Sequence, residues 1–270
     1  GALMLATSKT QVSDAARNEA NSQRNSAFKT ITPIHFTYGN ISDEDGETVF
    51  TDENALYPIG IKTTLNTYVY KSSPYNNFVI LKYTFQNTSQ VTISKFYPGL
   101  FFDWDVTLDG GSDIVRYDAS SCMGYVWAKD RIPQNYAGVA LLTNTDKISF
   151  WPIYNSGDSQ WSIYDGFSFA EKYEALSSGV KRDSAGVGDI SFVIGSGETS
   201  LEAGKSMTVY YVMVAGNSLA ELRTAVNYAK QKLTVLSVKT TEIVPNEYSI
   251  IGNYPNPFNP STNIKFVMKE

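Results

Sequence analysis

Four aspartates stand close together in the stretch FFDWDVTLDGGSD, residues 101–113. Asp103 and Asp105 are two residues apart, and in a β-strand such residues point to the same side. Asp109 and Asp113 follow on a glycine-rich turn, where their oxygens could converge with the first pair. Carboxylate oxygens are the ligands that hard cations such as Ca²⁺ prefer. One hypothesis is therefore a calcium site formed by Asp103, Asp105, Asp109 and Asp113.

The spacing of these aspartates departs from the EF-hand loop that it resembles at its start. The glycine falls two places late, and Ile114 stands where the twelfth position requires a glutamate. The simpler explanation is a set of solvated aspartates, or aspartates paired with Arg116, at a strand end. A second acidic loop, SDEDGETVFTDEN, is a weaker candidate for calcium and is more simply a hydrated turn; its carboxylates include Asp43, Asp45 and Glu47.

Aromatic residues gather in the polar stretch FWPIYNSGDSQWSIYDGF, residues 150–167. Exposed rings in such a stretch can stack on the faces of sugars, while neighbouring polar groups bond the hydroxyls. The rings predicted to bind ligand are Trp151, Tyr154, Trp161 and Tyr164, with Asp158, Gln160 or Asp165 as hydroxyl partners. The alternative, which is the more common fate of aromatics in large sandwiches, is that these rings fill the core between two sheets.

Nucleophilic catalysis needs residue types that this chain scarcely has. A Ser-His-Asp or Cys-His arrangement requires an imidazole as general base, and the single histidine, His35, lies in the strand-like run ITPIHFTY. No G-x-S-x-G elbow or phosphate-binding loop is present. We therefore predict no catalytic residue in this chain.

Glycoside hydrolysis remains as an alternative because it requires only two carboxyl groups across a cleft. The sequence offers several carboxylates but selects no pair among them; the candidates are Asp103, Asp105, Asp165 and Glu171.

The amino-acid composition argues against several classes of function. The net charge is -5 and lysines and arginines form no cluster, which argues against nucleic acid as a partner. With Cys122 as the single cysteine, neither an internal disulfide nor a cysteine-rich zinc site can form. No apolar run approaches the roughly 20 residues that span a bilayer, so we expect no membrane span.

Short apolar or alternating runs fill residues 31–216, each bounded by Gly, Pro, Asn, Asp or Ser. Aromatics make up 13% of the chain, which favours β structure. We therefore predict an all-β fold, a large antiparallel β-sandwich over residues 1–235, of the supersandwich type found in galactose-mutarotase-like domains. One helix is expected near its end, because Ser218 and Glu221 form a capping-box pattern before an apolar stripe of helical period: Leu219, Leu222, Val226, Ala229 and Leu233.

The chain closes with a proline cluster, NYPNPFNPSTNIKFVMKE. Prolines fix φ and remove backbone donors, so this segment can be neither a helix nor a central strand. An alternating run follows from Asn263. We interpret residues 236–252 as a linker. Residues 253–270 are interpreted as a rigid proline-containing bend that leads into the first strand of another small β module.

The same residues resemble the opening of the C-terminal sorting domain of the type IX secretion system of Bacteroidetes and related phyla. The resemblance rests on the phrase YPNPFNPST followed by a strand. It implies an immunoglobulin-like domain that is truncated here, the type IX secretion machinery as a partner, and a secreted or cell-surface location. The matching residues are Tyr254, Pro255, Asn256, Pro257, Phe258, Asn259 and Pro260.

The preceding region resembles the part of secreted subtilisin-like serine peptidases that lies between the catalytic and sorting domains. The resemblance is carried by NNFVILKYTFQNTSQVTISKFYPGLFFDWDV, YAGVALLTN and AGNSLAELRTAV. It implies a non-catalytic accessory domain whose catalytic domain lies upstream in the parent chain and is its partner. We expect the chain to be an internal fragment or a mature, trimmed product of a longer protein. The alternatives are a carbohydrate-binding module, with glycans as partners, and a glycan-active enzyme.

Overall fold

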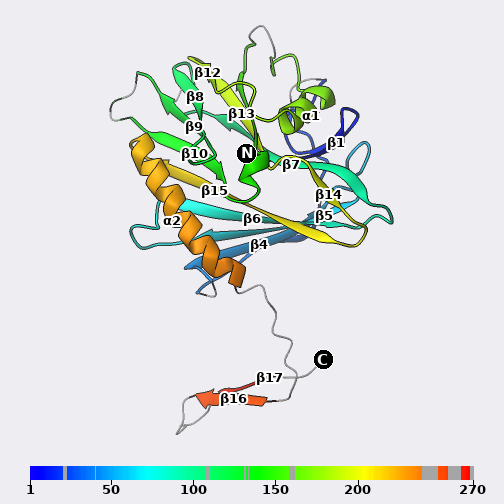
Figure 1. Ribbon diagram of the computed structural model, residues 1–270, viewed down its shortest axis with the longest axis vertical. Helices are drawn as coiled ribbons and strands as arrows, with labels where there is room; N and C mark the ends of the chain where they lie inside the picture. The colour runs from blue at the N-terminus through cyan, green and yellow to red at the C-terminus, as the bar shows by residue number, and fades with distance from the viewer. Residues whose placement is uncertain are drawn as a thin grey trace. The chain divides into compact units, whose positions relative to one another are not determined.

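The computed structural model describes residues 1–20, 23–39, 41–106, 110–130, 132, 134–157, 162–238, 249–254 and 263–267. The chain divides into two compact units, Gly1–Lys230 and Gln231–Glu270. The first unit is a large all-β sandwich of two antiparallel sheets, followed by a C-terminal helix, and this confirms the predicted fold class (Figure 1). Among the described residues, no helix is long and apolar enough to cross a membrane.

The larger sheet runs in the order β12-β8-β9-β10-β15-β6-β5-β4-β3. Every neighbouring pair in it is antiparallel. Its strands are β3 (Lys29–Thr37), β4 (Glu44–Thr51), β5 (Ile61–Val69), β6 (Phe78–Asn87), β8 (Asp113–Asp118), β9 (Met123–Ala128), β10 (Tyr136–Leu141), β12 (Ser184–Gly186) and β15 (Ser206–Gly216).

The smaller sheet runs in the order β11-β13-β7-β1-β2, and β14 pairs with the other half of β7. The short 3-10 helix η1 (Thr145–Lys147) precedes β11. The strands of this sheet are β1 (Ala2–Ser8), β2 (Gln11–Asp14), β7 (Ile93–Trp104), β11 (Ser149–Tyr154), β13 (Ile190–Gly195) and β14 (Thr199–Leu201).

The main core lies between the two sheets and follows from alternation along the strands. In β6, Leu81, Tyr83 and Phe85 point to the same side and belong to this core. Tyr83 and Phe85 are nearly parallel with ring centroids 5.9 Å apart, and Phe85 meets Phe96 of β7 edge-on at 5.6 Å. Aromatic rings from both sheets therefore interlock across the interior.

A second core lies on the other face of the smaller sheet, beneath helix α1 (Phe169–Ser177). Ser168 caps α1, because its Oγ accepts from the backbone N–H of Glu171 at 3.3 Å while the Glu171 carboxylate accepts from the N–H of Ser168 at 2.8 Å. Leu176 is fully buried against the sheet at Gly99, where an added Cβ would lie 2.3 Å from a Leu176 methyl carbon. Helix α1 was not predicted from the sequence.

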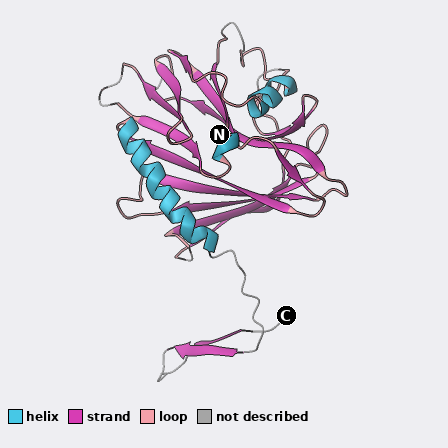
Figure 2. Ribbon diagram, in the orientation of Figure 1, coloured by secondary structure: helices cyan, strands magenta, loops and turns pink. Residues whose placement is uncertain are grey.

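Helix α2 (Leu219–Val238) is the predicted C-terminal helix (Figure 2). Leu222, Val226 and Ala229 of the predicted stripe are fully buried. Its start differs slightly from a capping box: Ser218 Oγ accepts from the N–H of Glu221 at 3.2 Å, but the Glu221 carboxylate accepts from the N–H of Asn217.

The second unit contains the hairpin of β16 (Ser249–Tyr254) and β17 (Asn263–Val267), with Tyr254 opposite Asn263. β17 is the strand predicted after the prolines. The remaining residues of the predicted sorting motif, 255–260, lie outside the described residues, as does most of the predicted linker, at 239–248.

Candidate functional site

The aspartates predicted to bind calcium have different partners in the structure. Asp103 on β7 accepts hydrogen bonds from Arg17 at 2.5 Å and from Asn155 Nδ2 at 2.9 Å. Asp113, at the start of β8, is fully buried and accepts from the backbone N–H of Val106 at 2.9 Å. Asp105 Oδ1 lies against Gly110, and Asp109 is outside the described residues. In the described part of the chain, no three acidic, histidine or cysteine side chains gather as metal ligands do.

Asp103 instead belongs to a polar network with Asp189, which precedes β13. Asn155 Nδ2 donates to Asp189 Oδ1 at 2.6 Å as well as to Asp103, and Ser191 Oγ lies 2.9 Å from Asp103 Oδ1. The Tyr164 hydroxyl donates to the other oxygen of Asp189, and this hydrogen bond, with partial burial, raises the pKa of Tyr164 to about 12. The network ties β7, β11 and β13 to the segment before α1.

Asp103 and Tyr164 are thus candidates that the sequence offered, whereas the residues that join them were not predicted. Asn155 and Asp189 are 34 residues apart, and only the antiparallel pairing of β11 with β13 brings them together. Two of the candidate carboxylates for glycoside hydrolysis have other partners: Glu171 caps α1, and Asp103 pairs with Arg17.

The aromatic residues predicted to bind ligand also lie in different surroundings. Trp151 of β11 is only 4% exposed and lies in the core beneath α1, so its ring offers no face for stacking, which corrects the prediction for this residue. Tyr154 is half-buried, and its ring lies so close to Gly188 that an added Cβ there would be 2.3 Å from a ring carbon. Tyr164 is 54% exposed, and Trp161 is outside the described residues.

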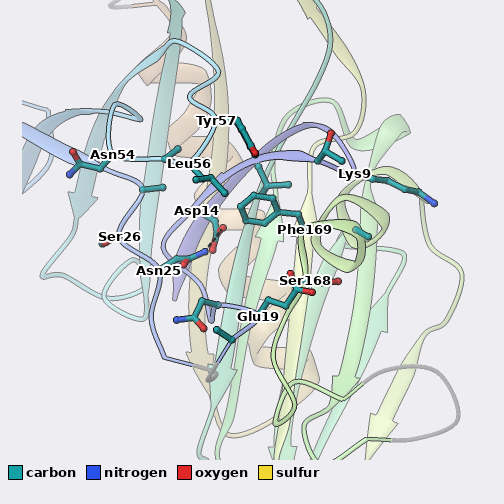
Figure 3. A pocket seen from close by; sticks show the side chains of 17 residues that line it. Lys9, Asp14, Glu19, Asn25, Ser26, Asn54, Leu56, Tyr57, Ser168 and Phe169 are labelled. Carbon is teal, nitrogen blue, oxygen red and sulfur yellow. Dashed lines mark hydrogen bonds between the residues drawn. The ribbon is translucent and has the colours of Figure 1, made fainter.

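A pocket of about 760 Å³ opens elsewhere, at the end of the β1–β2 hairpin (Figure 3). Its walls are formed by the hairpin, by residues 18–20 and 25–27, by residues 54–57, and by the start of α1. Backbone hydrogen bonds hold these walls together. The N–H of Asn54 donates to Ala27 O at 3.1 Å, and the N–H of Phe167 donates to Asn18 O at 3.1 Å.

Asp14 and Lys172 form a buried ion pair at this pocket. Lys172 Nζ lies 3.0 and 3.1 Å from the two carboxylate oxygens, and the side chains are 0% and 1% exposed. Asp14 also accepts from Asn25 Nδ2 at 3.0 Å and from the N–H of Ala16 at 2.9 Å. Burial lowers the pKa of Lys172, and the Asp14 charge opposes that shift. Each oxygen thus has two donors, which fills the acceptor capacity of the carboxylate.

The pocket rim combines apolar side chains with unburied polar groups. Leu56 is 72% exposed, Tyr57 is 56% exposed, and both line the pocket together with Phe169 of α1 (Figure 3). Asn54 and Glu19 are exposed polar lining residues. Such a mixture can bind a ligand that has both apolar faces and hydroxyl groups.

No pattern in the sequence predicted this pocket. Its lining residues are scattered from Lys9 to Ala170, so neither a motif nor a spacing connects them. The one local signal was the Ser168–Glu171 capping pattern, which marks the start of α1 and therefore one wall.

Comparison with known proteins adds information about the fold. No family model and no curated protein sequence matches the chain. It superposes on part of a bacterial glucoamylase, solved in complex with acarbose, with a TM-score of 0.51 and 14% identity; the match covers 85% of this chain and 28% of the glucoamylase. The chain thus spans well under a third of that enzyme.

Two further solved structures are less similar. The heparan sulfate lyase HepC from Pedobacter heparinus matches with a TM-score of 0.38 and 8% identity, over 73% of this chain and 22% of the lyase. A Klebsiella pneumoniae protein assigned as an aldose 1-epimerase matches with a TM-score of 0.29 and 8% identity, over 70% of this chain and 54% of that one. The β-sandwich of this chain is therefore shared with a domain-sized part of the glucoamylase.

Proposed function

We propose that this chain is a non-catalytic accessory domain of an exported bacterial protein, and that it binds carbohydrate in the pocket between the β1–β2 hairpin and α1. The observation that carries the proposal is the composition of the lining: exposed Tyr57 and Leu56 and half-buried Phe169, together with the exposed polar residues Asn54 and Glu19.

The chemistry of a sugar matches this lining. A pyranose has C–H-rich faces that pack on aromatic and aliphatic side chains, and hydroxyls at its edge that bond amides and carboxylates. The volume of about 760 Å³ is within the range of pockets that hold small ligands. The glucoamylase of similar fold, which was solved in complex with acarbose, is consistent with this ligand class.

The hydrogen bonding of the carboxylates supports a proposal of binding without catalysis. Glycoside hydrolysis requires two carboxyl groups that can donate, accept or attack. Asp14 already has four donors on its two oxygens, and this leaves Glu19 as the one carboxylate of the pocket lining with acceptor capacity for a ligand. A single such group supports hydrogen bonding to a hydroxyl and provides no acid–base pair.

The export part of the proposal is supported by the sequence. The motif Tyr254–Pro260 resembles the type IX sorting signal, and the region before it resembles the accessory part of subtilisin-like peptidases. We therefore propose a secreted or cell-surface parent of that peptidase class. In the native producer, a full-length parent cut after residue 252 should fail to reach the medium or the cell surface. Normal export of that truncated protein would contradict this part of the proposal.

A glycan array followed by titration calorimetry tests carbohydrate binding. We expect Tyr57→Ala to weaken binding of the best glycan by about tenfold or more, because an aromatic contact and its buried area are lost. Tyr38→Ala is the matched control, since Tyr38 is a 69% exposed tyrosine that does not line the pocket. Absence of binding by the native protein, or equal weakening by both variants, would overturn the proposal.

A further inference from the structure

A row of polar side chains crosses four neighbouring strands of the larger sheet. The register places His35 of β3 opposite Glu47 of β4, Glu47 opposite Asn66 of β5, and Asn66 opposite Lys82 of β6. Residues that face each other in an antiparallel sheet project from the same surface. Because Leu81 and Tyr83 on either side of Lys82 point into the core, this surface is the outer one.

A groove of about 260 Å³ lies along the part of this row that runs from His35 to Asn66, and Lys82, opposite Asn66 in the register, lies next to the groove without lining it. His35, Glu47 and Asn66 line it, together with Asp45 and Tyr68. Asn66 Nδ2 donates to Glu47 Oε2 at 2.8 Å, which fixes both side chains across the groove. The Asp45 carboxylate already accepts hydrogen bonds from the backbone N–H groups of Ile41 and Ser42, at 2.9 Å each. The groove shares no lining residue with the pocket at α1.

Three groups in the row keep unused hydrogen-bonding capacity. Within the described residues, no carboxylate lies within ion-pair distance of the half-buried Lys82 ammonium, and the His35 imidazole makes no hydrogen bond. Glu47 uses Oε2 for Asn66, which leaves Oε1 as an acceptor. Burial lowers the pKa of Lys82, while the nearby Glu47 charge opposes the shift. A half-buried ammonium without a partner is a place where an anion gains more than it would in water.

We propose that this row binds a carboxylate-bearing sugar of the uronic acid class. Lys82 pairs with the sugar carboxylate, and Glu47, Asn66 and His35 bond its hydroxyls. A simple anion fits less well, because Glu47 and Asp45 make the groove next to Lys82 negative. A neutral sugar fits less well too, because it leaves Lys82 without a counter-charge. The proposal is independent of the pocket at α1, since the two sites share no residue.

Calorimetric titration with digalacturonate, neutral galactobiose and sodium acetate tests this proposal on the whole chain. We expect digalacturonate to bind, and Lys82→Met to weaken it about tenfold or more, because a charge-assisted contact is lost. Lys62→Met is the matched control: Lys62 lies four residues before Asn66 on β5, so it projects from the same surface but outside the row. Lys82→Arg should retain most of the affinity, and thermal melting checks that each variant is folded.

The variants distinguish binding at this row from binding in the pocket at α1. Tyr57→Ala, which tests the pocket, should leave digalacturonate binding unchanged. Equal affinity for galactobiose, equal weakening by Lys62→Met, or full affinity in Lys82→Met would each overturn the proposal. Competition by acetate at the same concentration as digalacturonate would show that an anion alone is bound, and would overturn it as well.

Discussion

Lys172 of α1 holds both carboxylate oxygens of Asp14, at 3.0 and 3.1 Å, although 158 residues separate the two along the chain. Both side chains are at most 1% exposed. The pair joins the end of β2 to α1, which form two walls of the same pocket. The rings of Phe167 and Phe169 lie 5.5 and 5.6 Å from the ammonium and complete its enclosure.

Removing one member of this pair should be costly. We expect Lys172→Met to lower the free energy of unfolding by about 3–5 kcal/mol, because it leaves the Asp14 carboxylate buried without its counter-charge. Urea denaturation measures this difference. The control is Lys29→Met in the exposed Lys29–Glu53 pair, where the loss should be far smaller. Similar losses in both variants would show that the Asp14–Lys172 pair has no special role.

The pocket wall at Glu19 depends on a glycine. Gly166 has φ +116°, and an added Cβ would lie 2.1 Å from the carbonyl oxygen of Glu19. We expect Gly166→Ala to lower stability and to weaken glycan binding, since the segment that carries Glu19 must move. Gly204→Ala is the control: Gly204 also has a positive φ of +72°, but nothing lies within 4 Å of the added Cβ. Denaturation and calorimetry of both variants should give a larger loss at Gly166, and an equal loss would contradict the steric argument.

More of the fold than of the candidate site could be predicted from the sequence. Strand alternation and the capped apolar stripe of α2 are local patterns, and the structure confirms both. The nine-residue helix α1 is less visible, because its buried face includes Lys172, whose charge the sequence gives no reason to bury. The pocket and the polar row depend on register and on contacts between distant segments, such as Asn66 with Lys82, which no local pattern specifies.

Two aromatic residues of the same stretch should respond in opposite ways to removal. Trp151 lies in the core, so Trp151→Ala should lower the free energy of unfolding by about 3–5 kcal/mol. Tyr164 is 54% exposed, so Tyr164→Ala should cost much less despite its hydrogen bond to Asp189. Denaturation curves of the two variants measure the contrast. A small loss in Trp151→Ala would mean that this ring is not packed in the core.

The contact between α2 and β8 should depend on pH through Asp118. Arg223 donates to both of its oxygens, from Nη2 at 2.8 Å and from Nε at 3.1 Å. Burial acts to raise the pKa of Asp118, but hydrogen bonds from Arg223, Ser121 and Ser120 outweigh it and hold the pKa below its usual range. A carboxyl group whose pKa is lower in the folded state stabilises the fold above its unfolded pKa of about 3.9. That stabilisation is lost as the pH falls through the folded-state pKa.

Arg223→Met removes the largest of the contacts that lower this pKa, so the pH dependence gives a direct test. The free energy of unfolding of the native protein should exceed that of the variant at pH 7, and the difference should shrink as the pH falls below about 4. Lys205→Met removes a positive charge from an exposed position and controls for the change in net charge. Urea denaturation from pH 7 to pH 3 measures both differences. The contrary result is a difference in free energy of unfolding between the native protein and Arg223→Met that stays constant over that range. In that case Arg223 contributes to stability through packing of its side chain, and the charged contact with Asp118 does not stabilise α2.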